Sequence, residues 1–149
     1  MKKILVSCLV LFLLFTPKAF AAESEVVGSD ELNRIITETT VVEPRYTYLG
    51  YMTVGLDIYE DGRIVYGGSA RAPYHNVRIT LYLQRSTNGL FWEELEGTVK
   101  TAYDSVSADG GRTVDADDYF YRVKIITDVM DADRNIIETA TGYSDSERY

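Results

Sequence analysis

The segment 131–135 reads Asp-Ala-Asp-Arg-Asn and places carboxylate and amide side chains at alternating positions. Oxygen ligands at alternating positions are what a hard cation such as Ca²⁺ takes from a loop. The pattern then breaks, because Ile136 stands where a calcium loop carries Gly and Gly142 stands where it carries Glu. Asp and Asn are also ordinary turn residues. A hairpin turn is therefore the favoured interpretation, and Asp131, Asp133 and Asn135 are a weak calcium candidate only.

Residue types that serve catalysis are present without the partners that their chemistry needs. His75 is the single histidine, and no second strong metal ligand lies near it in the sequence, so we interpret it as a loop residue. The stretch 67–70 (GGSA) has the wrong order for a nucleophile elbow. Some pair among the 23 acidic residues will always be close, but no insertion that would wall a glycosidase cleft is present. We expect no catalytic residue, no cofactor and no enzymatic activity.

The elements that position these residues are β-strands. Residues 76–85 (NVRITLYLQR) alternate strictly between aliphatic and polar side chains. Because a strand has a period of two, the aliphatic residues share one face, while Tyr82 lies on the other. Tyr82, together with Tyr66 of the preceding expected strand, is the candidate for an outward binding face.

Further runs rich in β-branched and aromatic residues are separated by turn signals. The expected strands are 46–59, 63–72, 76–85, 90–95, 99–106, 119–129 and 136–143. The expected turns or breaks are 61–62, 73–75, 88–89, 109–111 and 131–135. About seven short strands in roughly 100 residues predict an all-β, antiparallel β-sandwich of the immunoglobulin type. The polar tail 144–149 is expected to fray.

The first 21 residues have the parts of a secretory signal peptide. Two lysines precede the apolar run 4–15, and Ala19-Phe20-Ala21 supplies the small-x-small pattern, so we expect cleavage after Ala21, with Ala22 as the alternative. The run is short for a retained anchor, which needs about 20 residues. The acidic stretch 22–44 contains no aromatic residue and is expected to be a flexible leader. The protein is thus predicted to be secreted and extracellular, with a domain at 45–143.

The chain is acidic, with a formal net charge of −8. Loss of residues 1–21 removes three lysines and no acidic residue, which leaves 12 basic and 23 acidic residues, a net charge of −11. Nucleic acids and anionic membranes are polyanions, so neither is expected as a partner. The only cysteine, Cys8, is lost with the signal peptide.

Two motifs carry a resemblance to known families. The segment 83–92 (LQRSTNGLFW) and the segment 119–123 (YFYRV) resemble fibronectin type III and immunoglobulin-like sandwiches. The resemblance implies that Tyr119 forms a tyrosine corner with the loop 113–117, and we expect Trp92 to lie in the core. Residues 44–143 look more closely like a group of small secreted bacterial proteins of unknown function. That likeness implies fold and export but no activity.

These observations predict a secreted, non-enzymatic binding module. Its partner would be an unknown extracellular protein or glycan, bound through loops or a Tyr-bearing face. The alternative is a small secreted effector, antimicrobial or toxin-like, that acts on other cells. A binding module should bind with the domain alone and kill nothing, whereas an effector should inhibit growth when added pure.

Overall fold

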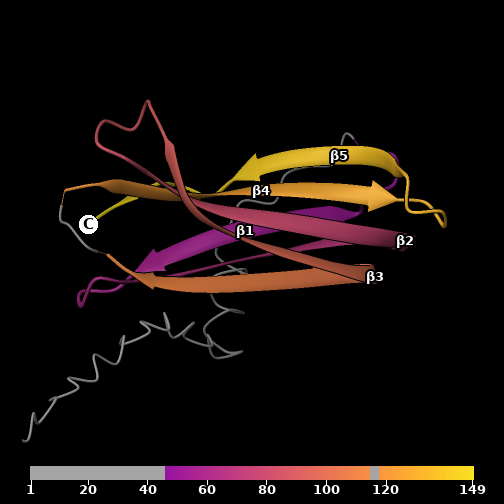
Figure 1. Ribbon diagram of the computed structural model, residues 1–149, viewed down its shortest axis with the longest axis horizontal. Helices are drawn as coiled ribbons and strands as arrows, with labels where there is room; N and C mark the ends of the chain where they lie inside the picture. The colour runs from indigo at the N-terminus through magenta and orange to yellow at the C-terminus, as the bar shows by residue number, and fades with distance from the viewer. Residues whose placement is uncertain (1–45, 115–117) are drawn as a thin grey trace, which may run out of the picture.

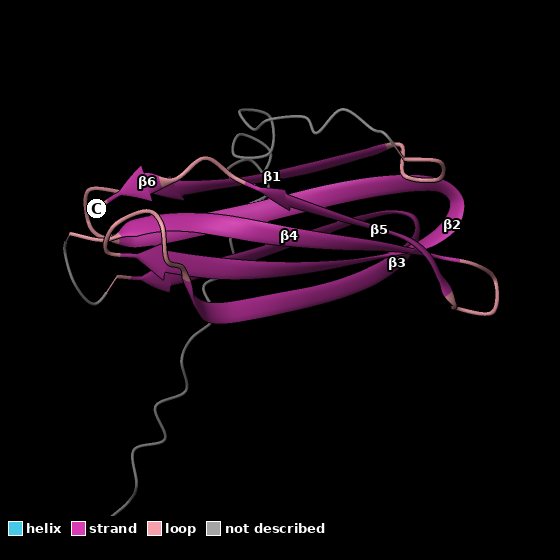
Figure 2. Ribbon diagram, turned by 90° about the horizontal axis from the view of Figure 1, so that it is seen from above, coloured by secondary structure: helices cyan, strands magenta, loops and turns pink. Residues whose placement is uncertain are grey.

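The computed structural model describes residues 46–114 and 118–149, which form six β-strands and no helix (Figures 1 and 2). The strands are β1 Tyr51–Ile58, β2 Arg63–Ser86, β3 Glu93–Thr113, β4 Phe120–Met130, β5 Ile136–Tyr143 and β6 Glu147–Arg148. Every strand pairing is antiparallel. The all-β class is therefore as expected. The expected signal peptide (1–21) and leader (22–44) lie outside the described residues.

Two long strands, β2 and β3, make one continuous curled sheet. Along one edge, β2 pairs with β3 over both of its halves. Along the other edge, residues 64–71 of β2 pair with β1, and residues 76–86 pair with β4. β5 and β6 then pair with β4. One edge of β2 thus changes partner from β1 to β4, and in the curled sheet β1 packs across the core from β4 (Figure 1).

An irregularity in the middle of β2 and β3 causes the bend. Residues 72–75 of β2 stand opposite Asp104 alone, and both Tyr74 and Asp104 have a φ of 66°. Such bulges bend a strand and increase its twist. The sequence pattern predicted a break at 73–75 between two strands, which is wrong, because Pro73 falls in the bulge, where its missing N–H removes no ladder bond. The chain passes through as one strand.

The expected turn at 109–111 is also wrong, because these residues lie inside β3. Gly110 stands directly opposite Tyr66 of β2, and a Cβ at Gly110 would lie 2.3 Å from the Tyr66 ring and hydroxyl. Gly97 stands opposite Tyr82 in the same way, with 3.1 Å to the ring. Both glycines therefore make room for a cross-strand tyrosine rather than for a turn.

Tyr66 is 1% exposed, so its predicted place on an outward binding face is wrong. Its hydroxyl donates a hydrogen bond to Glu96 Oε1 at 3.1 Å. Burial, and then the nearby Glu96 carboxylate, raises the pKa of the Tyr66 phenol, which stays protonated as the donor. Since Gly110 and Glu96 lie in opposite halves of β3, Tyr66 joins the two halves of the bent strand.

The core lies between the inner faces of the curled sheet. The four aliphatic residues expected on one face of residues 76–85 are all 0% exposed, as the alternation predicted: Val77, Ile79, Leu81 and Leu83. They pack with the inward side chains of β1 and β4 in one hydrophobic cluster. Contacts across the core are close, since Thr127 Oγ1 of β4 lies 3.0 Å from Met52 Sδ of β1.

The C-terminal tail was expected to fray, but it is paired with the sheet. Glu147–Arg148 forms β6 beside the start of β4. The Tyr149 N–H donates to the Tyr119 carbonyl oxygen at 3.1 Å, and the Asp118 N–H donates to the Tyr149 carbonyl oxygen at 2.6 Å. The Tyr119 ring packs against the core. Residues 115–117 of the loop expected to receive its hydroxyl lie outside the described residues.

We predict that Gly110→Ala destabilises the protein by about 2 kcal/mol or more, because the methyl group displaces a fully buried tyrosine. The matched control, Gly97→Ala, should cost only about 1 kcal/mol, because its methyl group would lie 3.1 Å from the ring of the partly exposed Tyr82 rather than 2.3 Å from a buried ring. Urea unfolding measures both. Equal losses for the two variants would contradict the role given to Tyr66.

Candidate binding face

The face of β3, β2, β4 and β5 that points away from the core is polar and aromatic, and we call it the outer face. The register places Tyr82 beside Lys124 and Gly97, and it places Gln84 beside Arg122 and Glu94. The other members of the outer face lie in these and the neighbouring rows of the register: Arg78, Thr80, Ile126, Asp128, Thr139, Thr141, Tyr143, Val99 and Thr101. Tyr82 thus lies on the outer face, as the alternation predicted.

At one end of this face, Arg122 lies between two aromatic rings. Its guanidinium carbon is 4.0 Å from the centroid of the Trp92 ring and 4.3 Å from that of Tyr143. The Arg122 Nε–H donates to Gln84 Oε1 at 2.9 Å. Gln84 is only 5% exposed and also donates to Glu94 at 3.3 Å. We call Trp92, Arg122, Tyr143 and Gln84 the arginine platform.

The platform retains a positive charge that the fold does not neutralise. Partial burial lowers the pKa of Arg122, yet a guanidinium remains charged at neutral pH. Glu94, which lies in the same row of the register beyond Gln84, pairs with Lys124 at 3.3 Å. Within 46–114 and 118–149, no carboxylate forms an ion pair with Arg122. Its remaining N–H groups are available to a partner.

Trp92 is not in the core, which corrects the sequence-based expectation. It is half-buried on the outer face, outside the hydrophobic cluster, and its indole N–H donates to the Gly89 carbonyl oxygen at 3.1 Å. The pairing of β2 and β3 shifts register between Leu83 and Gln84. Because of this shift, and because Leu83 already fills the core, Trp92 lies on the outer face. Local sequence does not reveal either condition.

The loop between β2 and β3 stands out from the sheet beside the platform (Figure 1). Its apolar tip consists of Leu90 and Phe91, which are 76% and 80% exposed. Side chains hold the loop: Ser86 Oγ accepts from the Gly89 N–H at 2.9 Å, and Asn88 Oδ1 accepts from the Leu90 and Phe91 N–H groups at 2.9 and 3.1 Å. The tip is therefore a pre-shaped apolar feature.

His75 and Glu138 lie at the other end of the domain and have structural roles. His75 Nδ1 is 2.7 Å from the Pro73 carbonyl oxygen, which only accepts, so Nδ1 carries a proton. The His75 ring lies 4.9 Å from the Tyr48 ring. The Glu138 carboxylate accepts the backbone N–H groups of Thr47, Tyr48 and Leu49 at 2.6, 2.9 and 2.8 Å. It thereby fixes the entry of the chain beside β5.

The weak calcium candidate forms the expected β4–β5 turn. Asp131 Oδ1 accepts the Asn135 N–H at 2.9 Å, and Oδ2 accepts from the Asn135 amide at 3.1 Å. These bonds to Asn135 lower the pKa of Asp131. In the described part of the chain, no group of three or more His, Cys, Asp or Glu side chains is arranged to hold a metal ion. The turn itself uses both oxygens of Asp131.

No protein-family model, curated protein or solved structure matches this chain. Among residues 46–114 and 118–149, there is no helix long and apolar enough to span a bilayer.

We predict an acid-dependent loss of stability through Glu138. Burial alone would raise its pKa, but the three backbone N–H bonds outweigh burial and lower it. The contribution of the Glu138 carboxylate to the free energy of unfolding is therefore complete above its ordinary pKa of 4.5. It is lost as the pH falls through the lower pKa of Glu138 in the folded protein. Glu138→Gln should cost about 1–2 kcal/mol at pH 7 and much less at pH 3 by urea unfolding.

The control for this prediction is Glu93→Gln. Glu93 has a side chain that is 64% exposed and pairs with Arg85 at the surface. Its loss should change stability by less than about 0.5 kcal/mol at both pH values. A Glu138→Gln penalty that is the same at pH 7 and pH 3 would contradict the carboxylate's role.

Proposed function

We propose that this protein is a secreted, non-enzymatic binding module that holds an extracellular partner protein at the arginine platform and the Leu90–Phe91 tip. The signal-like N-terminus supports export. The net charge of −8 disfavours nucleic acids and anionic membranes as partners, because like charges repel. The arrangement of the outer face supports binding rather than catalysis.

One observation carries the proposal: a stacked, unneutralised arginine lies beside an apolar tip whose backbone is held by Ser86 and Asn88. Trp, Tyr and Arg are the residues that dominate the energetics of protein interfaces. Here the Arg122 guanidinium is already held by two rings and Gln84. Binding through Arg122 therefore costs little side-chain entropy, because this side chain is held before a partner arrives.

A partner protein fits this surface better than a glycan. Leu90 and Phe91 are exposed apolar anchors that need an apolar pocket in the partner. The free N–H groups of Arg122 suit a carboxylate at the rim of that pocket.

We also propose a finer description of the fold. Two halves of a curled sheet around one core are compatible with an immunoglobulin or fibronectin type III-like sandwich, and an experimental structure would test that likeness.

We predict that the purified protein captures a specific protein from native culture medium or envelope, and that capture depends on this surface. Leu90→Ser with Phe91→Ser should weaken binding at least tenfold, and Arg122→Gln should weaken it about fivefold. Trp92 is the only tryptophan, so its fluorescence reports binding during titration with the captured partner. Circular dichroism checks that each variant is folded.

The matched control is Tyr74→Ser, which removes an 84% exposed aromatic residue remote from the tip in the register of β2. It should bind as the wild type does. Equal capture by all variants, or capture of a glycan without protein, would contradict the proposal. Growth inhibition by the pure protein would favour the alternative, a small secreted effector.

A further inference from the structure

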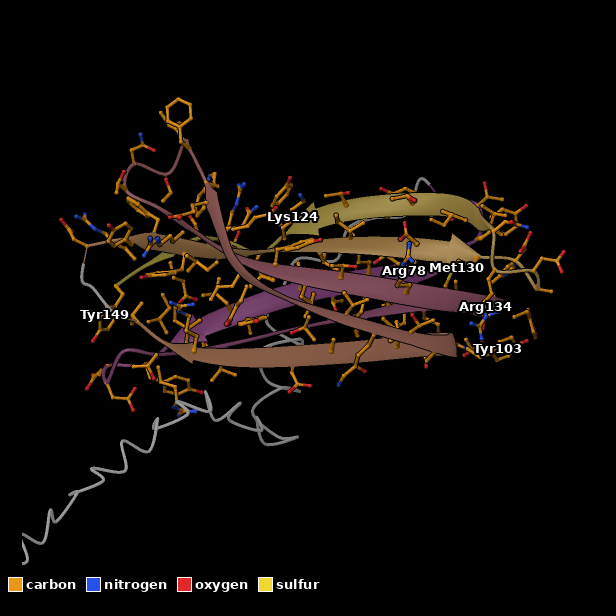
Figure 3. All side chains as sticks on the ribbon, in the orientation of Figure 1. Arg78, Tyr103, Lys124, Met130, Arg134 and Tyr149 are labelled. Atoms are coloured by element: carbon orange, nitrogen blue, oxygen red, sulfur yellow. The ribbon has the colours of Figure 1, made fainter. Side chains whose placement is uncertain are left out.

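A second feature of the outer face lies at the end opposite the platform. There a half-open pocket of about 430 Å³ is lined by Asn76, Arg78, Thr101, Ala102, Tyr103, Met130 and Arg134. Its residues come from β2, β3, β4 and the β4–β5 turn, and Figure 3 shows Arg78, Tyr103, Met130 and Arg134 at this end. The volume is within the range of small-molecule sites.

The pocket has an excess of positive charge. Arg78 is held by Asp128, whose Oδ2 accepts from Nε at 3.0 Å and from Nη2 at 2.6 Å. Those bonds use two of its five N–H donors. Arg134 differs, because none of the residues described in 46–114 and 118–149 forms a side-chain hydrogen bond or ion pair with it. Two guanidinium groups therefore line the pocket, and only that of Arg78 is paired with a carboxylate among the described residues.

Arg134 also stands in a strained backbone conformation. Its φ is 65°, the left-handed region where turns normally carry Gly or Asn. The bond from the Arg134 N–H to the Asp131 carbonyl oxygen, 3.1 Å, shows that the turn itself needs only the backbone at this position. An arginine here costs backbone strain and gives the turn no side-chain bond among the described residues. Such strain concentrates at functional positions.

The remaining wall is aromatic and apolar. Tyr103 is 63% exposed, makes no ring contact with any residue of 46–114 or 118–149, and stands opposite Asn76 in the register. Met130 stands on the other side of Asn76 and is 5% exposed. The pocket thus combines a flat ring, an apolar floor, an amide and a guanidinium. This set recognises a flat or ring-shaped molecule that carries an anionic group.

We propose that this pocket binds a small ring that carries a carboxylate, with Arg134 as the carboxylate-binding group and Tyr103 as the surface against the ring. Sugar acids and aromatic acids share this chemistry. The site goes beyond the proposed function, since it lies roughly 26 Å along β2 from the arginine platform, eight residues away at about 3.3 Å each. It does not require the partner protein.

Binding is tested on the purified protein by NMR titration with glucuronate, benzoate, acetate and glucose. We expect millimolar binding of at least one ring acid, with shifts at Thr101, Ala102 and Asn135. Acetate should bind at least tenfold more weakly, and glucose should produce no shifts. The two ring acids decide whether the ring is saccharide or aromatic. No shifts with either ring acid up to about 50 mM, or equal binding of acetate, would overturn the proposal.

Two substitutions separate recognition from folding. Arg134→Gly removes the guanidinium and relieves the positive φ, so binding should fall at least tenfold while the melting temperature is unchanged or higher by up to about 5 °C. Arg134→Lys keeps the charge and should retain binding within about fivefold. Unchanged binding in Arg134→Gly would overturn the role of Arg134. The Leu90→Ser, Phe91→Ser variant should bind the acids as the wild type does, so the two proposals fail independently.

Discussion

The Tyr66 side chain lies inside the bend of the curled sheet, with its ring over Gly110 and its hydroxyl bonded to Glu96. One buried residue of β2 thus contacts both halves of β3, on either side of the bulge opposite residues 72–75. A sheet bent this way turns β1 over β4 and encloses the aliphatic side chains between them. The bend is therefore the constraint on which the core depends, and Gly110 permits it sterically.

The same bend leaves one broad face of β3, β2, β4 and β5 outside, with polar and aromatic residues that satisfy one another. Arg122 lies between two rings, and Gln84 bonds both Arg122 and Glu94. In the part of the chain that the structure describes, no buried side-chain polar atom lacks a partner. Such a face is ordered before any partner arrives. A preorganised surface favours recognition, because the entropy of ordering was lost in folding.

Backbone strain is not spread evenly over this fold. Three of the four non-glycine residues with positive φ in the described chain, Tyr74, Asp104 and Arg134, belong to the bulge and to the β4–β5 turn. The bulge strain is explained by the bend. At Arg134 the turn sets the positive φ, and glycine would adopt it without strain. Among the described residues, the Arg134 side chain makes no hydrogen bond or ion pair within the turn, so it is free for the recognition role proposed for it.

The sequence alone determined the strand character, because a period of two and aromatic and β-branched enrichment are local properties. It also determined the inward set of residues 77–83 and the turn at 131–135, which depend on near neighbours only. It did not reveal that residues 73–75 continue a strand, that 109–111 lie inside one, that Tyr66 is buried or that Trp92 is outside. Those outcomes depend on which strands pair and in what register. Register is fixed by contacts between residues far apart in the chain, such as Gly110 with Tyr66, so these four outcomes follow from the folded chain and not from local sequence.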